Sequence, residues 1–482
     1  MTPSAFTVPG LLPAAAEIFL LGMACVVLLV DIWLPDRYRR LTCQIAQASL
    51  AGALILVLAT FPDARATTFA GTFVADPMAA VLKTFLLLVS GFGFFYARVH
   101  LEPRGLMRGE YFVLGLFAVL GMMVLVSAGN FLTLYLGLEL LSLSLYAMVA
   151  LDRDSKPGCE AAMKYFVLGA LASGMLLYGI SMIYGSTGSL DLATVGASIS
   201  ATGDMRLTLV LGLVFVVVGV AFKLGAVPFH MWVPDVYEGA PTPVTLFIAT
   251  APKIAAFGML MRALVDGLGG LAADWSQMLV VLAVLSMAAG NVIAIAQTNI
   301  KRMLAYSAIA HVGFVFVGMA PGTPDGYAAS MFYVLTYVLM ALGGFAMVIW
   351  LGRAGHEADL LDDFRGLNDR NPWFAFMMLI LMLSMAGVPP FVGFWAKWSV
   401  LREAVDAGMI WLAVAAVLFS VVGLFYYLRV VRLMYFESPR DAAPVTAFAD
   451  MKVVVSVNAL AILALGVYPG ALLDLCEAVI GA

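Results

Sequence analysis

Apolar runs long enough to cross a bilayer recur from one end of the chain to the other. A helix needs about 20 mostly apolar residues to cross the hydrocarbon core, whereas strands of a membrane barrel are about 10 residues long and alternate in polarity. The pattern therefore predicts helices, which satisfy their own backbone groups in lipid. Gly, Pro and charged residues separate fourteen such runs, near 11–34, 43–61, 77–97, 110–127, 130–150, 162–184, 207–233, 241–262, 275–297, 302–320, 326–351, 372–400, 408–431 and 452–475.

Composition supports this interpretation. Of the 482 residues, 63% are hydrophobic and 12% are charged, against roughly 25% charged in an average soluble domain. No stretch is left for a sizeable soluble domain, so we expect an all-α polytopic protein forming a single membrane domain over 1–482. The first run lacks a preceding basic segment and is too long for a signal peptide, so we expect it to be retained as a helix.

Charge is informative by its location. Seventeen of the 26 basic residues, Lys301 and Arg302 among them, follow odd-numbered runs. Only Arg65, Arg206, Arg262 and Arg402 follow even-numbered runs. Because cytoplasmic loops carry the excess of Lys and Arg, this asymmetry predicts that both termini lie outside, on the periplasmic side of a bacterial inner membrane.

The five basic residues left inside the runs are all lysines: Lys83, Lys164, Lys223, Lys253 and Lys397. Arginine stays charged at any accessible pH, whereas burial can lower the pKa of a lysine by several units. The membrane interior thus contains the cation that can take up and release protons, which predicts a proton-conducting row. Lys83 and Lys164 lie near the ends of their runs, where a long side chain can reach the surface; we expect Lys83 outside the row and leave Lys164 open.

One acidic residue, Glu139, lies in the middle of the fifth run. An unpaired carboxylate at that depth costs several kcal/mol, so it requires a cation, water or a bound proton. We expect its partner to be a lysine of the seventh or sixth helix. A purely structural ion pair between two helices is the alternative.

Prolines stand beside three of the lysines. Pro228 removes the hydrogen bond to the carbonyl of Leu224 next to Lys223, and Pro252 frees the carbonyl of Ile248 beside Lys253. Broken backbone at membrane depth is tolerated where it is buried in protein or lines a wet cavity. The proline pair at 389–390 interrupts the twelfth run shortly before Lys397. The pattern predicts helix breaks along an interior polar path, although simple kinks remain an alternative.

Two histidines extend the set of candidate proton carriers. His230 follows the break at Pro228, and His311 lies deep in the tenth run. An imidazole titrates near neutrality without a large perturbation. A lone histidine in an apolar helix is equally compatible with a structural role, and His311 is the stronger candidate.

Other classes of site are not indicated. The four cysteines, Cys25, Cys43, Cys159 and Cys476, show no metal or cluster spacing, and no nucleotide-binding or zinc-protease motif occurs. A net charge of −4 gives no basic patch for nucleic acid. We expect no metal and no cofactor in this chain.

The segment His230-Met-Trp-Val-Pro-Asp-Val-Tyr-Glu-Gly-Ala-Pro-Thr-Pro-Val244, together with Glu139, Lys223, Lys253 and the prolines of the twelfth run, resembles the antiporter-like membrane subunits of respiratory complex I. The resemblance runs over nearly the whole chain. The Tyr-Glu-Gly-Ala-Pro continuation and a lysine at position 397 favour the subunit N family of bacterial NADH:quinone oxidoreductase over its sister families.

The resemblance implies two inverted five-helix repeats, at 110–262 and 275–431, with discontinuous helices 7 and 12. Helices 1–3 at 11–97 and helix 14 at 452–475 flank them. It implies that Glu139 and Lys223 form a coupling pair, that Lys253 and His311 continue a hydrophilic axis, and that Lys397 serves the outward exit. Lys164 matches a further family lysine, and His230 belongs to the same motif.

It further implies a non-redox subunit of a proton-translocating enzyme that couples quinone reduction elsewhere to proton transfer. FMN, iron-sulfur clusters and quinone are expected in other subunits. The expected partners are the lipid bilayer and neighbours of the M, K and J types. Two alternatives remain open at this stage: a subunit of a multisubunit cation/proton antiporter, and a structural module whose buried charges only hold helices together.

Overall fold

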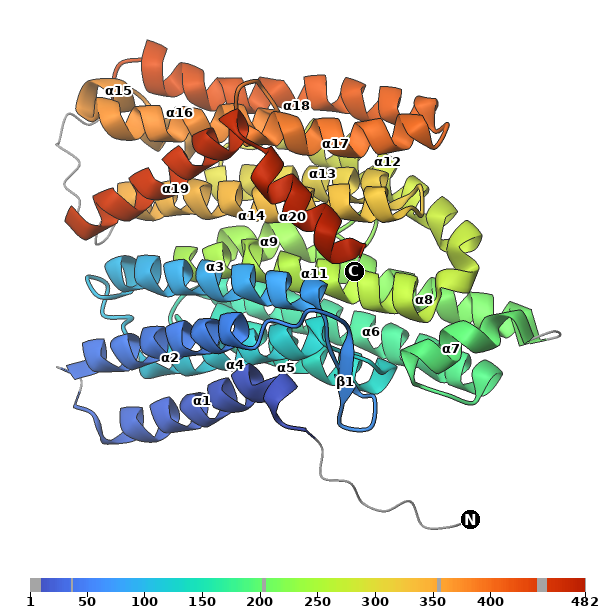
Figure 1. Ribbon diagram of the computed structural model, residues 1–482. Helices are drawn as coiled ribbons and strands as arrows, with labels where there is room; N and C mark the ends of the chain where they lie inside the picture. The colour runs from blue at the N-terminus through green and yellow to red at the C-terminus, as the bar shows by residue number, and fades with distance from the viewer. Residues whose placement is uncertain (1–9, 36–37, 202–204, 353–356, 440–448, 482) are drawn as a thin grey trace.

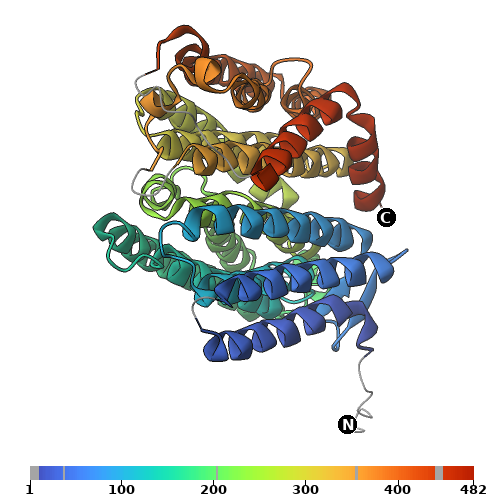
Figure 2. The same cartoon turned by 90° about the vertical axis from the view of Figure 1, so that its left-hand side faces the viewer.

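The computed structural model describes residues 10–35, 38–201, 205–352, 357–439 and 449–481. Within these ranges the elements are helices joined by loops, together with one antiparallel hairpin in which β1 (Ala66–Thr68) pairs with β2 (Phe73–Ala75). The predicted all-α membrane fold is therefore confirmed. The long helices lie side by side as a bundle in both views of the molecule (Figures 1 and 2).

The first three predicted runs form three long helices, of which the first two lie at one side of the bundle and the third packs further inside. They are α1 (Ala15–Trp33), which follows the 3-10 turn η1 (Leu12–Ala14), α2 (Arg39–Ala59) and α3 (Pro77–Leu101). The side chain of Asp76 accepts a hydrogen bond from the amide of Ala79 at 2.9 Å and so caps α3, whose first residue is a proline.

The next predicted runs supply a second group of helices: α4 (Gly109–Val126), α5 (Phe131–Val149), α6 (Lys156–Thr187), the short α7 (Leu192–Ser198) with η3 (Ile199–Ala201), α8 (Arg206–Leu224), α9 (Trp232–Gly239), α10 (Thr242–Ala249) and α11 (Ala251–Leu260). A π-helical segment, η5 (Met261–Gly267), continues α11 and leads to η6 (Gly269–Leu271).

The remainder of the bundle consists of α12 (Ala272–Ile295), α13 (Ile300–Met319), α14 (Pro324–Leu351), η7 (Leu361–Phe364), α15 (Leu367–Arg370), α16 (Pro372–Ala386), α17 (Val392–Asp406), α18 (Ile410–Phe436), α19 (Ala449–Val467) and α20 (Gly470–Ile480). Every predicted run overlaps at least one of these helices. In the described ranges, thirteen helical stretches are long and apolar enough to span a membrane, and α16 is a shorter apolar helix.

Four predicted runs are each divided into two helices. Two of the breaks contain a glycine in the left-handed region, Gly225 at φ +80° and Gly387 at φ +85°. There the glycine amide closes the preceding helix and the chain leaves the helical path. These are the predicted discontinuities of the seventh and twelfth helices. The eighth run breaks at Thr250, before Pro252. The fourteenth ends its first half at Val467, before Pro469, which the run pattern did not predict.

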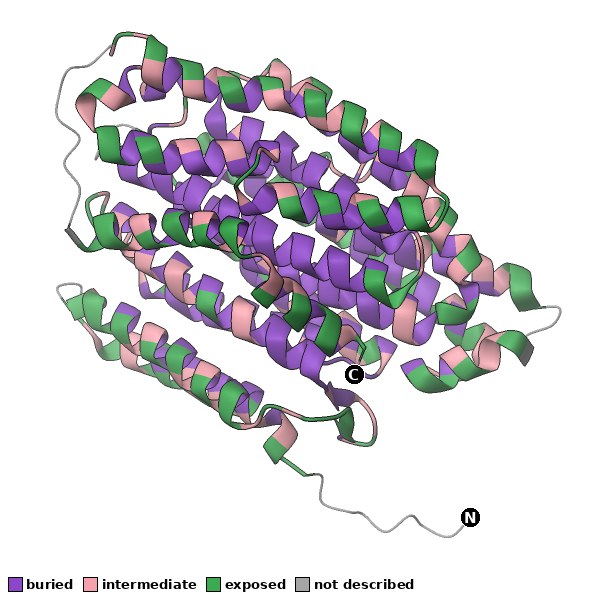
Figure 3. Ribbon diagram, turned by 45° about the horizontal axis from the view of Figure 1, so that its top comes forward, coloured by how far each residue is buried: buried purple, intermediate pink, exposed green. Residues whose placement is uncertain are grey.

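Burial is concentrated in the middle of the bundle. Figure 3 shows the inner helices largely buried and the outer ones exposed along one face. Most residues of α10, α11, α13 and α14 are buried, whereas α1, α6 and α18 expose many large apolar side chains. Those exposed faces suit contact with lipid or with other membrane subunits.

Candidate functional site

Glu139 and Lys223 do not contact each other. Each is hydrogen-bonded to a different serine. On α5, Glu139 is half-buried and accepts a hydrogen bond from the hydroxyl of Ser173 on α6. One turn further along α5, Ser142 lies 2.5 Å from the Nζ atom of Lys223. No oxygen of Glu139 comes within 4.0 Å of a lysine nitrogen in the described structure.

The predicted partner, a lysine of the seventh helix, therefore does not contact Glu139 directly. The two charges still act on each other electrostatically. Each group has its own serine partner, Ser173 for the carboxylate and Ser142 for the ammonium group of Lys223, which reaches α5 three residues beyond Glu139. Helix geometry places residues three apart on one face, so both groups look toward the same region between α5 and α8.

The break after α8 is closed by a lysine from another helix. Lys253, on α11, is 3% exposed, and its Nζ atom donates a hydrogen bond of 2.6 Å to the carbonyl oxygen of Leu224, the last residue of α8. Its ammonium group also lies 5.8 Å from the centre of the Trp232 ring. The carbonyl that Pro228 was predicted to free is thus the one that Lys253 binds. The second expectation, a cation on the carbonyl of Ile248, was wrong because Lys253 points at α8 instead.

A small cavity adjoins this break. It measures about 10 Å³ and lies among Lys223, Tyr165, Trp232 and Pro252, with leucines of α4 and α5 around it. A site of this size holds about one water molecule. Lys223 and two residues of the segment carrying Lys253, Pro252 and Ala256, line this cavity.

The break after α16 repeats the same device. The Nζ atom of Lys397, on α17, donates 2.8 Å hydrogen bonds to the carbonyl oxygen of Ala386, the last residue of α16, and to the hydroxyl of Ser420 on α18. Leu224 and Ala386 each immediately precede the left-handed glycine of their break. Both carbonyls are C-terminal helix groups, which attract cations through the helix dipole.

His311 lies in a chain of hydroxyl groups on the side of Lys397. Its Nδ1 atom is 2.7 Å from the hydroxyl of Tyr333, and its Nε2 atom is 3.1 Å from that of Tyr427. The Tyr427 hydroxyl in turn lies 2.5 Å from that of Ser307. The charge of Lys397 also acts electrostatically on the imidazole of His311. The imidazole is thus hydrogen-bonded on both nitrogens, a geometry suited to passing a proton between them.

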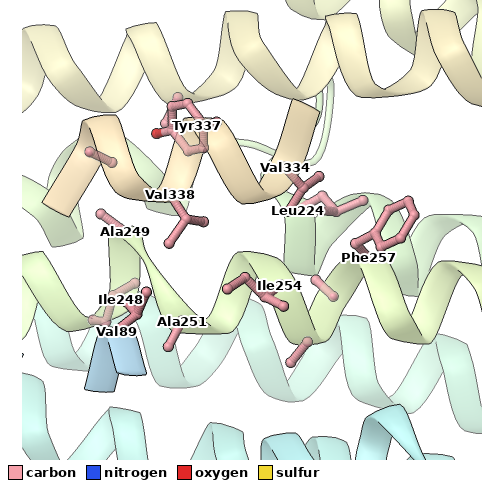
Figure 4. Close-up of a cluster of buried hydrophobic side chains, with 14 of the residues drawn as sticks. Val89, Leu224, Ile248, Ala249, Ala251, Ile254, Phe257, Val334, Tyr337 and Val338 are labelled. Carbon is pink, nitrogen blue, oxygen red and sulfur yellow. The ribbon is translucent and has the colours of Figure 1, made fainter. Parts of the chain in front are cut away.

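An apolar cluster lies where α11 packs against α14. Figure 4 shows Val334, Tyr337 and Val338 of α14 facing Ala251, Ile254 and Phe257 of α11, beside Leu224. Tyr337 connects this cluster to His311, because the centre of its ring lies 4.8 Å from that of the imidazole. The structure therefore brings the candidates into two groups, one around Lys223 and Lys253 and the other around His311 and Lys397.

Lys164 and His230 lie apart from these groups. The Nζ atom of Lys164 contacts Asp235 at 2.7 Å and Glu160 at 2.8 Å, and its side chain is 43% exposed. Asp235 also binds Arg302 at 2.7 Å, so Lys164 belongs to a network on α9. His230 lies within the break, and its Nδ1 atom has no partner in the described part of the chain.

Three charged groups were misplaced by the sequence pattern. Lys83 does not reach the surface: it is 5% exposed and its Nζ atom lies 2.5 Å from Glu17 of α1. Arg262, predicted in a loop, is 1% exposed because Asp76 and Asp266 bind it at 2.7 and 2.8 Å. Lys301, also predicted in a loop, is the second residue of α13 and is 4% exposed.

The signals for these groups were partly present. Asp266 stands one helical turn from Arg262, which is ion-pair spacing, and Glu17 lies inside the first apolar run. Ser142, Ser173, Tyr333 and Tyr427 carried no signal, because hydroxyl residues are common in apolar helices and their partners are distant in the chain. Only the packing of α5, α6, α14 and α18 reveals them.

The chain was compared with known proteins. A family model described as NADH:quinone oxidoreductase/Mrp antiporter, TM, matches residues 128–423. NADH-quinone oxidoreductase subunit N of Thioalkalivibrio sulfidiphilus is 57% identical over 476 residues, covering 98% of this chain and 99% of the relative. The subunit of the same name from Thiobacillus denitrificans is 58% identical over 469 residues, covering 97% of each chain.

Solved structures agree. A chain of respiratory complex I from Thermus thermophilus is 34% identical and superposes with a TM-score of 0.82, covering 95% of this chain and 98% of that one. A chain of the Mrp complex from Dietzia sp. DQ12-45-1b has a TM-score of 0.84 at 23% identity, covering 98% and 97%, which shows a shared fold. The predicted family is confirmed, and the antiporter alternative is not favoured. This chain belongs to the subunit N family of NADH-quinone oxidoreductase, antiporter-like membrane subunits of a proton-translocating complex.

Proposed function

We propose that Lys223, Lys253, His311 and Lys397 carry protons through this subunit, that Glu139 controls entry to the row, and that Lys164 and His230 assist at its edge. One observation carries the proposal: two buried lysines, Lys253 and Lys397, each bind the last carbonyl of a helix broken at a glycine. A helix C-terminus stabilises the ammonium form, whereas burial penalises it. Opposed forces of this kind let a small electrostatic change move a proton on or off the amine.

The steps follow from the contacts. A change of charge near Glu139 acts electrostatically on Lys223, which faces the small cavity shared with the Lys253 segment. A proton released there can be received by Lys253 across one water molecule. Because coupled groups titrate as a set, the lysines are treated as one system.

The apolar cluster of Figure 4 then acts as the barrier between the two groups. Water must enter between α11 and α14 for a proton to pass from Lys253 to the side of His311. On that side the hydroxyls of Tyr333 and Tyr427 join the imidazole, and Lys397 is the next amine. A dry barrier prevents leakage until it is wetted, which coupling to a distant reaction requires.

The remaining assignments belong to this proposal. The energy comes from quinone reduction elsewhere in the complex, with FMN, iron-sulfur clusters and quinone held by other subunits and no cofactor or metal in this chain. We place the two repeats at 110–262 and 275–431, supported by the matching lysine caps. M, K and J type subunits are the neighbours, both termini face the periplasm, and the membrane is the bacterial inner membrane.

The test uses the purified complex in proteoliposomes carrying Lys223→Met or Lys397→Met. Lys156→Met, an exposed lysine at the start of α6, is the matched control. We expect both row variants to lose proton transport coupled to NADH oxidation, while the control keeps it. Full transport and full electron transfer in both row variants would overturn the proposal, and sodium-dependent, NADH-independent transport would favour an antiporter.

A further inference from the structure

A charged cluster lies where α3 ends and α13 begins, at the end predicted to face the cytoplasm. One oxygen of Glu357 is 3.4 Å from Nε2 of His100 and 3.0 Å from Nε of Arg104, and the other accepts a 3.1 Å hydrogen bond from Thr242. The side chain of Glu357 is 43% exposed, whereas that of His100 is 1% exposed. The carboxylate therefore meets water on one side and a buried imidazole on the other.

Two buried polar atoms have no hydrogen-bond partner in the described residues: Nδ1 of His100, in the cluster, and the hydroxyl of Tyr237, on α9. Leaving such atoms unpaired costs free energy, and buried water is their usual partner. Tyr237 is fully buried on α9 and interacts electrostatically with Tyr337. The Tyr337 ring lies 4.8 Å from the imidazole of His311. The unpaired hydroxyl of Tyr237 therefore indicates a place for buried water close to the central row.

Helix α9 connects the two places. It begins at Trp232, whose ring lies against the ammonium group of Lys253. It is followed by Ala240, whose carbonyl accepts a 3.1 Å hydrogen bond from buried Lys301 at the cluster. The eight residues of α9, at 1.5 Å per residue, span about 12 Å. The distance from the cluster to the row is thus a few water diameters.

We propose that His100 and Glu357 form the site at which protons enter the row from the predicted inner side. This inference rests on the proposed function. A proton from bulk water binds Nε2 of His100 and Nδ1 releases its own proton to buried water beside Tyr237, which leaves the neutral ring protonated on Nε2. Rotation of the ring then resets it for the next proton. Glu357 is a positioning residue: its charge stabilises the imidazolium.

Three charged groups face His100. Burial opposes the protonated ring most strongly, Glu357 favours it, and Arg104 and Lys301 oppose it. The pKa of Glu357 itself falls to about 2, because burial, which would raise it, is outweighed by the hydrogen bond and charge of His100 and by the charges of Arg104 and Lys301. Glu357 therefore stays ionised across the physiological range, and the imidazole is the group in the cluster that can exchange a proton there.

The experiment compares Glu357→Gln and His100→Gln in proteoliposomes with this end of the chain facing the bath. Glu437→Gln is the control, because its carboxylate pairs with Arg365 and Arg432 at the same end. We measure uncoupled NADH oxidation per assembled complex at bath pH 6.5 to 8.5. A positioned proton-transfer group commonly contributes 10²–10⁴-fold, so a loss of about tenfold at pH 8.5, recovering toward pH 6.5, is a conservative expectation.

Lys397→Met in the same preparation separates this inference from the proposed function. If Lys397→Met is inactive at every pH while Glu357→Gln and His100→Gln match Glu437→Gln, the entry site is wrong and the row stands. If Lys397→Met oxidises NADH at the wild-type rate, the proposed function fails first. Should His100→Gln fail to assemble, Glu357→Gln decides alone, because its side chain lies at the surface: a pH-dependent loss supports the site and a control-like profile overturns it.

Discussion

The buried ion pair between Glu17 of α1 and Lys83 of α3 makes a quantitative prediction. Glu17 is 6% exposed, and neither of its oxygens has a hydrogen-bond partner among the described residues, so the ammonium group 2.5 Å away is its single compensating charge. Replacing Lys83 by Met strands the carboxylate. Breaking a buried pair in this way costs about 3–5 kcal/mol.

Replacing Glu17 by Gln strands the ammonium group of Lys83 in the same way, so the cost of this variant lies in the same range of about 3–5 kcal/mol. The double variant carries neither penalty, and replacing a buried pair by neutral groups is often neutral or stabilising.

The assay is a double-mutant cycle on the assembled complex, read as the temperature at which this subunit is lost from the complex on native gels. We expect both single variants to destabilise strongly and the double variant to return close to wild type. Because the pair lies on α1 and α3, turnover per assembled complex should be unchanged in the double variant. A double variant as unstable as the sum of the singles would refute the reasoning.

Three further predictions follow from the contacts. Tyr427→Phe removes the hydroxyl between His311 and Ser307 and should lower NADH-driven proton transport. Tyr426→Phe is the control, because the Tyr426 hydroxyl bonds Asn291 at 3.1 Å instead, and it should leave transport unchanged. Equal transport rates in the two variants would contradict the relay. Gly387→Ala places a Cβ 2.8 Å from Cδ of Lys397 and should reduce turnover. Gly408→Ala, also at positive φ but in open space, should cost about 1 kcal/mol of backbone strain and leave turnover unchanged. Equal turnover in the two variants would contradict a role for the Lys397 contact. The lowered pKa of Glu357 stabilises the fold above the ordinary pKa of about 4.5, and this stability is lost as the pH falls toward about 2. The difference in thermal stability between wild type and Glu357→Gln should therefore shrink between pH 5 and 3. A constant difference would contradict this prediction.

The sequence was most informative where a residue type has few physical solutions. Pro228 requires a free carbonyl at Leu224, and that carbonyl is found bound to Lys253. Apolar runs fix the helices because lipid leaves the backbone no other way to satisfy its hydrogen bonds.

It failed where burial depends on packing between distant helices. Arg262 and Lys301 stand at helix ends, where a charge is normally solvated, yet α3 and α9 cover them. The hydroxyl partners of Lys223 and His311 come from α5, α14 and α18, at sequence separations that no local pattern encodes.

The central claim is that the lysines at the helix breaks exchange protons and do not merely cap helices. Lys253→Arg tests it directly, because arginine donates to the carbonyl of Leu224 and stays charged, yet does not release its proton at accessible pH. The measurement is proton transport per NADH oxidised by the assembled complex in proteoliposomes. The account predicts normal assembly with transport abolished; assembly with wild-type transport would show that the lysine is a cap and contradict it.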